Sequence, residues 1–252
     1  MTKHANSIKP GDVFRIGDHI LGCGDARDAA FVDRVICKTK IALLLVDPPY
    51  GVAFVESKEA FAKIRVKKKI LNDGIVSEPE YAEFTKDWLA PVVPHLAAKN
   101  AAYIFNSDKM LFALRDGMER SGIRFAQLLI WVKNHVVVGR KDYLPQHELV
   151  AYGWHGTHEF KKAKDKSVLF YPKPSRSPLH PTQKPVGLLR RLILNSSNIG
   201  DTVYDCFAGS GSTGIAAEEC KRKSILIERD EEYCQTIISR FEREFGIKAT
   251  KV

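Results

Sequence analysis

The chain has 252 residues, of which 44% are hydrophobic and 27% are charged, proportions typical of folded globular proteins. These values exclude a disordered or collagen-like chain, and no apolar run reaches the roughly 18 residues that a membrane-spanning helix needs. The net charge of +9 favours a polyanionic partner such as nucleic acid. Five cysteines without a CxxC pair indicate neither a disulfide framework nor a zinc site. Because no apolar signal core stands near the start, we expect a cytoplasmic protein without a membrane partner.

Short apolar runs alternate with helix-like stretches, which is typical of an α/β fold with a mostly parallel sheet. Two strands at 13–16 and 19–22 flank a Gly17-Asp18 turn and predict a hairpin. The apolar run 41–46 predicts a strand that is buried on both faces. The later elements are predicted helices at 80–97 (interrupted or ended near Pro91 and Pro94), 108–121, 185–196, 212–221 and 231–244, and predicted strands at 101–105, 125–132, 148–154, 202–206 and 224–228.

Two polar stretches without regular periodicity are predicted to be loops, at 55–79 and 155–179. The first contains Lys67-Lys68-Lys69, and the second contains four lysines between 161 and 166. Both are longer than ordinary connections, so they are predicted to be functional or disordered. Lysine contacts to phosphate give affinity without sequence information, so either loop could contact a nucleic acid.

A glycine-rich loop, Asp-Cys-Phe-Ala-Gly-Ser-Gly-Ser-Thr-Gly at 205–214, follows one predicted strand and opens a predicted helix. Its glycines match the pattern GxGxxG, which allows a tight turn and the close approach of a ligand to the backbone. Glu228 stands at the end of the next strand, where a carboxylate can accept hydrogen bonds from two ribose hydroxyls. This pattern predicts a nucleotide-type cofactor, and it leaves a dinucleotide and S-adenosylmethionine both open.

The loop Asp47-Pro48-Pro49-Tyr50 comes directly after the buried strand at 41–46. Consecutive prolines stiffen the turn and remove two N–H donors, so the Asp47 carboxylate and the Pro48 carbonyl form an acceptor pair. Such a pair suits an NH₂ group, and Tyr50 offers an aromatic face for a planar base. The two acceptors can draw the nitrogen lone pair of an exocyclic amine out of the ring, so that it attacks a sulfonium methyl group. This chemistry requires no metal ion.

Together these loops resemble the S-adenosylmethionine-dependent DNA amino-methyltransferases, and their order along the chain resembles the β group of that family. The resemblance covers most of the chain. Four further segments resemble elements of this family: Gly24-Asp25, the strand His147-Glu148-Leu149-Val150-Ala151-Tyr152, the segment His180-Pro181-Thr182-Gln183-Lys184-Pro185, and Ile227-Glu228.

The resemblance implies a Rossmann-like, seven-stranded, mostly parallel sheet with one antiparallel strand and helices on both faces, within a single catalytic domain over 1–252. It implies catalytic roles for Asp47, Pro48, Pro49 and Tyr50 on a base flipped out of double-stranded DNA. The residues expected to bind the cofactor are Asp25, Thr182, Gln183, Lys184, Asp205, Phe207, Ala208, Gly209, Ser210, Gly211 and Glu228. Lys184 is expected to pair with the methionine carboxylate. A homodimer is a further expectation of the β-group resemblance.

Several alternatives remain at this level. Asp47 at the first loop position favours N6 of adenine, because N4-cytosine enzymes more often resemble Ser-Pro-Pro-Tyr. An RNA adenine methyltransferase would share the chemistry and the basic charge. An NAD-dependent oxidoreductase would share only the glycine loop, and an inactive DNA-binding relative would be expected to lose Asp47 or Gly209. The stretch 155–179 is too short for an independent target-recognition domain, so we expect a short recognition site or low specificity, with an unknown recognition sequence.

Overall fold

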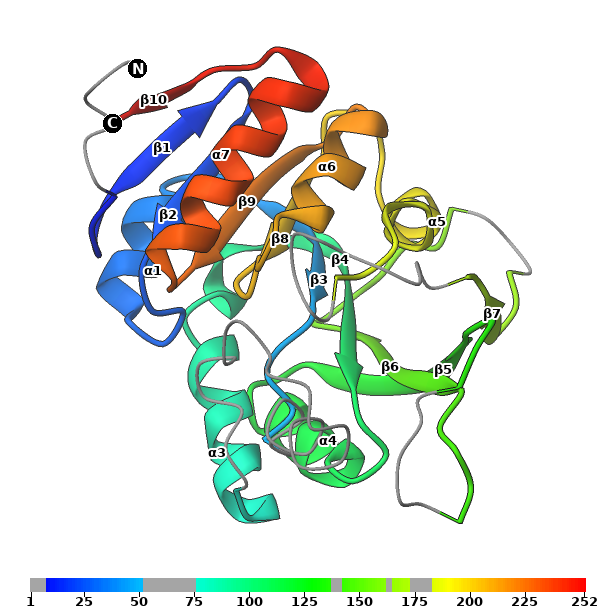
Figure 1. Ribbon diagram of the computed structural model, residues 1–252. Coiled ribbons are helices and arrows are strands. Elements are labelled where there is room, and N and C mark those ends of the chain that lie inside the picture. Colours follow the sequence, from blue (N-terminus) through cyan, green and yellow to red (C-terminus); the bar gives the residue numbers. More distant parts are fainter. Residues whose placement is uncertain (1–7, 52–75, 137–141, 162–164, 173–182) are drawn as a thin grey trace, which may run out of the picture.

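The computed structural model describes residues 8–51, 76–136, 142–161, 165–172 and 183–252 (Figure 1). Most of the predicted loop at 55–79, including its lysine cluster, lies outside the described residues, as do parts of the loop at 155–179. None of the described helices is long and apolar enough to cross a membrane.

One ten-stranded sheet organises the described chain, in the order β10-β1-β2-β9-β8-β3-β4-β6-β5-β7 (Figure 1). The strands are β1 Val13–Ile16, β2 His19–Cys23, β3 Ile41–Val46, β4 Leu96–Asn106, β5 Arg124–Val132, β6 His147–Trp154, β7 Val168–Phe170, β8 Thr202–Asp205, β9 Lys223–Glu228 and β10 Ala249–Lys251. The seven strands from β2 to β5 in this order are the predicted sheet, because β6 alone among them runs antiparallel to its neighbours. The predicted α/β class is therefore confirmed.

Three further strands make the sheet wider than predicted. The hairpin strand β1 pairs antiparallel with β2, and β10 pairs antiparallel with β1 at the edge. At the opposite edge, β7 pairs in parallel with β5. β7 and β10 have three residues each, which is too short for their sequences to show a periodic pattern.

Helices cover both faces of the sheet, as predicted. The helices are α1 Ala29–Ile36, α3 Glu78–Leu89, α4 Leu111–Arg120, α5 Val186–Ser196, α6 Ser212–Glu219 and α7 Glu231–Phe245, with a short 3₁₀ helix at Val93–His95. Residues of α1, α3 and α4 pack in one core with Leu44 and Val46 of β3. Residues of α5 and α6 pack on the opposite face with Leu43 and Leu45, while α7 packs over Leu21 and Leu226. Strand β3 is thus buried on both faces.

The helix predicted at 80–97 is shorter than expected. A capping box between Ser77 and Glu80 starts α3 at Glu78, and the helix ends at Leu89, before Pro91. A proline ring there would clash with the preceding turn of a continuing helix. The 3₁₀ helix follows, and β4 already begins at Leu96, so residues 96–97 belong to a strand.

The topology also positions the two predicted loops. Strands β3 and β8 are neighbours and run parallel, so their carboxyl ends meet at the same edge of the sheet. The loop that begins at Asp47 follows β3, and the glycine loop follows β8. Ligands of doubly wound sheets bind beyond these carboxyl ends, so the candidate site is expected at this edge.

Candidate active site at the carboxyl edge of the sheet

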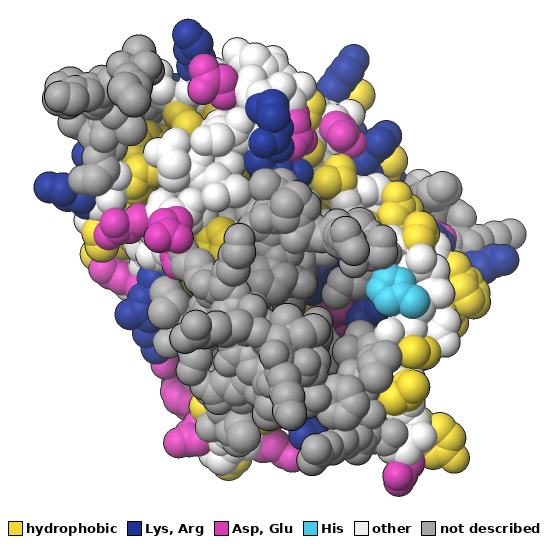
Figure 2. Space-filling view, viewed as in Figure 1, with side chains coloured by type: hydrophobic (Ala, Val, Ile, Leu, Met, Phe, Trp, Pro, Cys, Tyr) yellow, Lys and Arg dark blue, Asp and Glu magenta, His cyan; other side chains and the backbone are white. Residues whose placement is uncertain are grey.

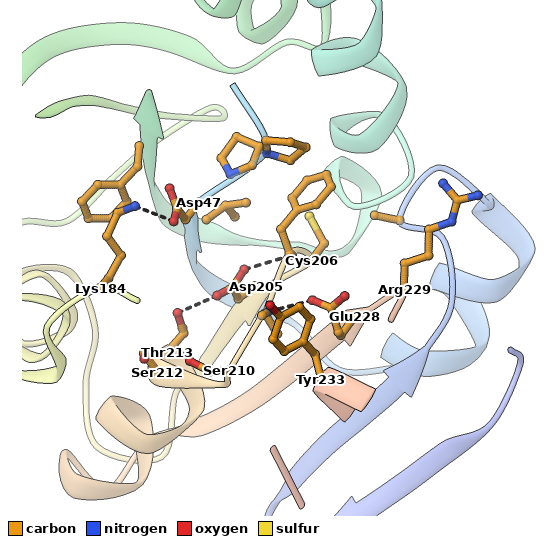
Figure 3. Close-up of a pocket in the computed structure, with 18 of the residues that line it drawn as sticks. Asp47, Lys184, Asp205, Cys206, Ser210, Ser212, Thr213, Glu228, Arg229 and Tyr233 are labelled. Carbon is orange, nitrogen blue, oxygen red and sulfur yellow. Dashed lines mark hydrogen bonds and ion pairs between the residues drawn. The ribbon is translucent and has the colours of Figure 1, made fainter. Parts of the chain in front are cut away.

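A pocket opens where the loops after β3 and β8 meet (Figure 3). Thirteen of the fifteen predicted site residues line it: Asp25, Asp47, Pro48, Pro49, Tyr50, Gln183, Lys184, Asp205, Phe207, Ala208, Gly209, Ser210 and Glu228. Thr182 lies outside the described residues, and Gly211 is not among the lining residues. Segments that are distant in sequence thus contribute to a single cavity.

Gly211 shapes the glycine loop from behind the pocket. It adopts a left-handed φ of 80° at the N-terminus of α6, and its N–H donates to the Ala208 carbonyl at 2.7 Å. A Cβ at this position would lie 2.9 Å from the Ile237 side chain, closer than side-chain atoms pack. Gly211 therefore permits the turn and the close packing of α7, while its contact with the cofactor stays a prediction.

Glu228 closes the side of the pocket nearest the glycine loop. Its carboxylate accepts hydrogen bonds from the backbone N–H groups of Gly209 at 2.7 Å and Asp230 at 2.8 Å. Burial raises the pKa of this carboxyl to about 7, although both backbone donors favour its charged form. The two bonds fix the carboxylate at the end of β9 and leave lone pairs for a ligand.

Asp205 lies deeper, at the end of β8. It accepts hydrogen bonds from the Thr213 hydroxyl at 2.6 Å and from the Phe207 N–H at 3.1 Å (Figure 3). Burial raises the pKa of this carboxyl to about 7, and the nearby carboxylates of Asp47 and Glu228 add to the shift. A pocket with two such carboxyls favours a ligand that brings a cation and hydroxyl donors.

The carboxylate of Asp47 already has two donors within the protein. The Lys184 ammonium lies 2.5 Å from Oδ2 (Figure 3), and the Tyr50 hydroxyl donates to Oδ1 at 2.8 Å. The same ammonium lies 3.2 Å from Oε2 of Glu148. The structure therefore places Lys184 against the predicted catalytic carboxylate, whereas the sequence led us to expect it near the methionine carboxylate of a cofactor.

Two charged residues of this site were missed by the sequence analysis. Glu148 of β6 lines the pocket, and its Oε1 pairs with the Lys133 ammonium at 2.7 Å. Their side chains are only 15% and 4% exposed, so both charges are buried. Glu148 stands directly before the uncharged run 149–154 of β6, and a carboxylate next to this run was the signal that could have identified it.

Asp25 lies at the rim of the pocket. Its carboxylate is held by the Arg27 guanidinium, with bonds of 3.0 and 2.7 Å, and Arg229 approaches to 3.8 Å. The Arg27 hydrogen bond lowers the pKa of Asp25, so this group stays charged. Phe207 continues the wall, packed against Trp88 and Phe84 at ring distances of 5.5 and 5.9 Å.

One face of the described surface carries both signs of charge. Figure 2 shows Lys and Arg side chains interspersed with Asp and Glu on this face, among the residues that are coloured. The described residues on this face therefore form no single basic patch, although the whole chain has a net charge of +9.

Comparison with known proteins identifies the family. A family model described as DNA methylase matches residues 41–239, which include both loops, and the chain belongs to this N6/N4 DNA methylase family. Members of this family transfer a methyl group to an amino group of a DNA base. The family assignment leaves the NAD-dependent oxidoreductase without support.

Two known methyltransferases are similar to the chain, one over most of its length and one over a short stretch. The chain is 26% identical over 235 residues to the type II methyltransferase M.HpaI of Haemophilus parainfluenzae, covering 83% of this chain and 70% of the relative. It is 52% identical over 63 residues to the DNA adenine methyltransferase YhdJ of Escherichia coli (strain K12), covering 25% of this chain and 21% of the relative.

Two solved structures share the fold. The M1.HpyAVI complex with S-adenosylmethionine (SAM) superposes with a TM-score of 0.64 at 24% identity, covering 87% of this chain and 98% of that one. The cytosine-N4-specific PvuII DNA methyltransferase also gives 0.64, at 17% identity, covering 88% and 92%.

Proposed function

We propose that this DNA methyltransferase uses S-adenosylmethionine to methylate the exocyclic N6 amine of an adenine that is flipped out of double-stranded DNA. The observation that carries the proposal is the meeting of two loops in one pocket. The acceptor pair after β3 and the glycine loop after β8 line the same cavity, because β3 and β8 are adjacent parallel strands. An amine held by the first loop would face a ligand held by the second.

The residues present fit S-adenosylmethionine, and the M1.HpyAVI relative was solved with this molecule. Glu228 is the acceptor for the ribose hydroxyls, since its fixed carboxylate retains free lone pairs. Asp205, with its buried carboxyl, would take the ammonium of the methionine end, and Phe207 and Ala208 would line the nucleoside. When bound, the cofactor supplies an electrophilic methyl group on a sulfonium.

Asp47 and the Pro48 carbonyl accept the two hydrogens of the target amine in this proposal. The carboxylate then takes the proton that the nitrogen must release, so no strong base is needed. Tyr50 and the wall beside it provide the apolar surface for the base, because Tyr50, Pro49 and Phe105 all line the pocket. These roles are the predicted ones, now supported by the arrangement of the side chains.

Adenine is favoured over cytosine on two grounds. The loop after β3 begins with Asp47, which is typical of the adenine enzymes, and the stretch with 52% identity belongs to a DNA adenine methyltransferase. The N4-cytosine reaction is the second candidate, because the fold equally resembles the cytosine-N4-specific PvuII enzyme.

The test is methyl transfer from labelled S-adenosylmethionine to mixed-sequence double-stranded DNA, followed by nucleoside analysis, with RNA as a parallel substrate. We expect the label in N6-methyladenine from DNA. Label in N4-methylcytosine would keep the enzyme class and overturn the base assignment. Label confined to RNA, or found in neither nucleic acid, would contradict the proposal.

The affinity for S-adenosylmethionine is expected to fall with acid. The carboxyls of Asp205 and Glu228 have pKa values of about 7, and each must be charged to bind its part of the cofactor. Below that pH each becomes protonated, so the dissociation constant should rise about fivefold per group between pH 7 and pH 6. Calorimetric titration from pH 8 to pH 5.5 measures this. Asp205→Asn should bind more weakly at pH 8 and with a flatter profile, whereas a flat wild-type profile would contradict both roles.

A further inference from the structure

We propose that Lys184 is a positioning residue of the target-amine site, which keeps the Asp47 carboxyl charged and oriented, and that it does not hold the cofactor. The inference rests on the proposed function and adds a residue to its machinery. It differs from the role that the sequence suggested, in which Lys184 pairs with the methionine carboxylate.

The contacts of the ammonium carry the proposal. Its Nζ lies 2.5 Å from Oδ2 of Asp47 (Figure 3), 3.2 Å from Oε2 of Glu148 and 3.3 Å from the Tyr50 hydroxyl. The side chain is only 6% exposed, and its ammonium also lies 5.0 Å from the centre of the Phe105 ring. A buried ammonium with partners on three sides has little freedom to turn toward another ligand.

The charges of this cluster balance. Asp47 and Glu148 supply two carboxylates, and Lys184 and Lys133 supply two ammonium groups, joined in the order Asp47–Lys184–Glu148–Lys133. Moving Lys184 to a cofactor would leave Asp47 and Glu148 as neighbouring buried carboxylates. Breaking a buried ion pair in this way is strongly unfavourable.

The cluster also explains how Asp47 can act as an acceptor. Burial raises the pKa of Asp47, and Glu148 adds to that shift, whereas Lys184 and the Tyr50 hydroxyl oppose it. A protonated Asp47 would keep only one acceptor oxygen and could no longer take the proton that the amine must release. Because Lys184 favours the charged form, it preserves the acceptor that the reaction needs.

Lys184 can stay in place while the amine binds. A carboxylate offers about four lone-pair positions, and Lys184 and Tyr50 use one on each oxygen of Asp47. One amine hydrogen needs only one of the remaining positions, and the Pro48 carbonyl accepts the other hydrogen. The ammonium thus fixes the carboxylate while leaving it able to bind the base.

Two measurements on Lys184→Met test the assignment. The dissociation constant of S-adenosylmethionine should stay within about threefold of the wild type, because Lys184 faces Asp47. The single-turnover rate at pH 7 should fall at least about tenfold, and the acid limb of the pH–rate profile should move up by about one unit or more. Lys184→Arg should return the limb toward the wild-type position, and the exposed Lys109→Met is the matched control. The proposal would be overturned if Lys184→Met bound S-adenosylmethionine about tenfold more weakly while the acid limb of its pH–rate profile stayed at the wild-type position.

A readout that needs no substrate separates this inference from the proposed function. In protein labelled with ¹³C-aspartate, the Asp47 resonance, assigned by its loss in Asp47→Asn, should titrate at higher pH in Lys184→Met than in the wild type. An unchanged titration would overturn the inference even in an active enzyme. A shifted titration would support it even if no DNA were methylated. Should Lys184→Met fail to fold, the double variant with Glu148→Gln removes one charge of each sign, and its Asp47 resonance should titrate at higher pH than in Glu148→Gln alone.

Discussion

Replacing Asp47 with alanine is expected to lower the rate of methyl transfer by about a thousandfold, with the affinity for S-adenosylmethionine within about threefold of the wild type. Removing one preorganised polar group that stabilises a transition state typically costs a hundred- to a thousandfold. Asp47 also removes the proton of the product and anchors Lys184 at 2.5 Å, so the upper end of this range is expected. Single-turnover kinetics on DNA and calorimetry with the cofactor measure the two quantities separately.

The controls for this experiment separate charge from shape. Asp47→Asn keeps one acceptor oxygen but loses the charge, so its rate should lie between those of the wild type and the alanine variant. Asp18→Ala changes an exposed carboxylate in the β1–β2 turn and should leave the rate unchanged. If Asp47→Ala kept most of its turnover, the acceptor-pair mechanism would be wrong.

Glu228→Ala is expected to weaken the binding of S-adenosylmethionine about a hundredfold. Hydrogen bonds to a charged group each contribute about 1.5–3 kcal/mol, and two ribose hydroxyls would lose theirs. The change also releases the Gly209 N–H, whose bond to Glu228 shapes the glycine loop. The single-turnover rate at saturating cofactor should change far less, because Glu228 lies away from the amine.

Two variants define the origin of that loss. Glu228→Gln preserves an acceptor without the charge, so about a tenfold weaker affinity is expected. Glu242→Ala removes an exposed carboxylate of α7 and should bind the cofactor normally. Wild-type affinity for S-adenosylmethionine in Glu228→Ala would refute the ribose assignment. If the rate of methyl transfer also fell strongly, Glu228 would instead contact the target base.

Local signals predicted the central sheet and the two loops. The run at 41–46 lies in the middle of the sheet because every side chain there is apolar, and both loops follow from prolines and glycines, whose backbone preferences are intrinsic. The pocket could then be anticipated, since parallel neighbours end at the same edge. α1 was not predicted, although its start carries a local signal, the Asp28 side chain that accepts the Phe31 N–H.

The electrostatic partners of Asp47 could not be predicted in the same way. Lys184 is 137 positions from Asp47, and Lys133 reaches the site only through Glu148. Such pairs depend on the order of β3, β4, β6 and β5 across the sheet and on where the segment before α5 passes. Nothing in the local sequence encodes that arrangement, so only the family resemblance guided the expected position of the ammonium, at the methionine end of the cofactor.

The pairing of β10 with β1 brings the beginning and the end of the described chain together (Figure 1). The Val252 N–H donates to the Val13 carbonyl at 2.9 Å. A short peptide joining the ends would therefore close the backbone into a ring without moving any strand. If this ring were opened between β7 and α5, the glycine loop would precede the Asp47-Pro48-Pro49-Tyr50 loop in the new chain. Strand β3 would still lie beside β8. The geometry of the site therefore does not depend on the order of the two loops along the chain, and that order reflects the evolutionary history of the gene.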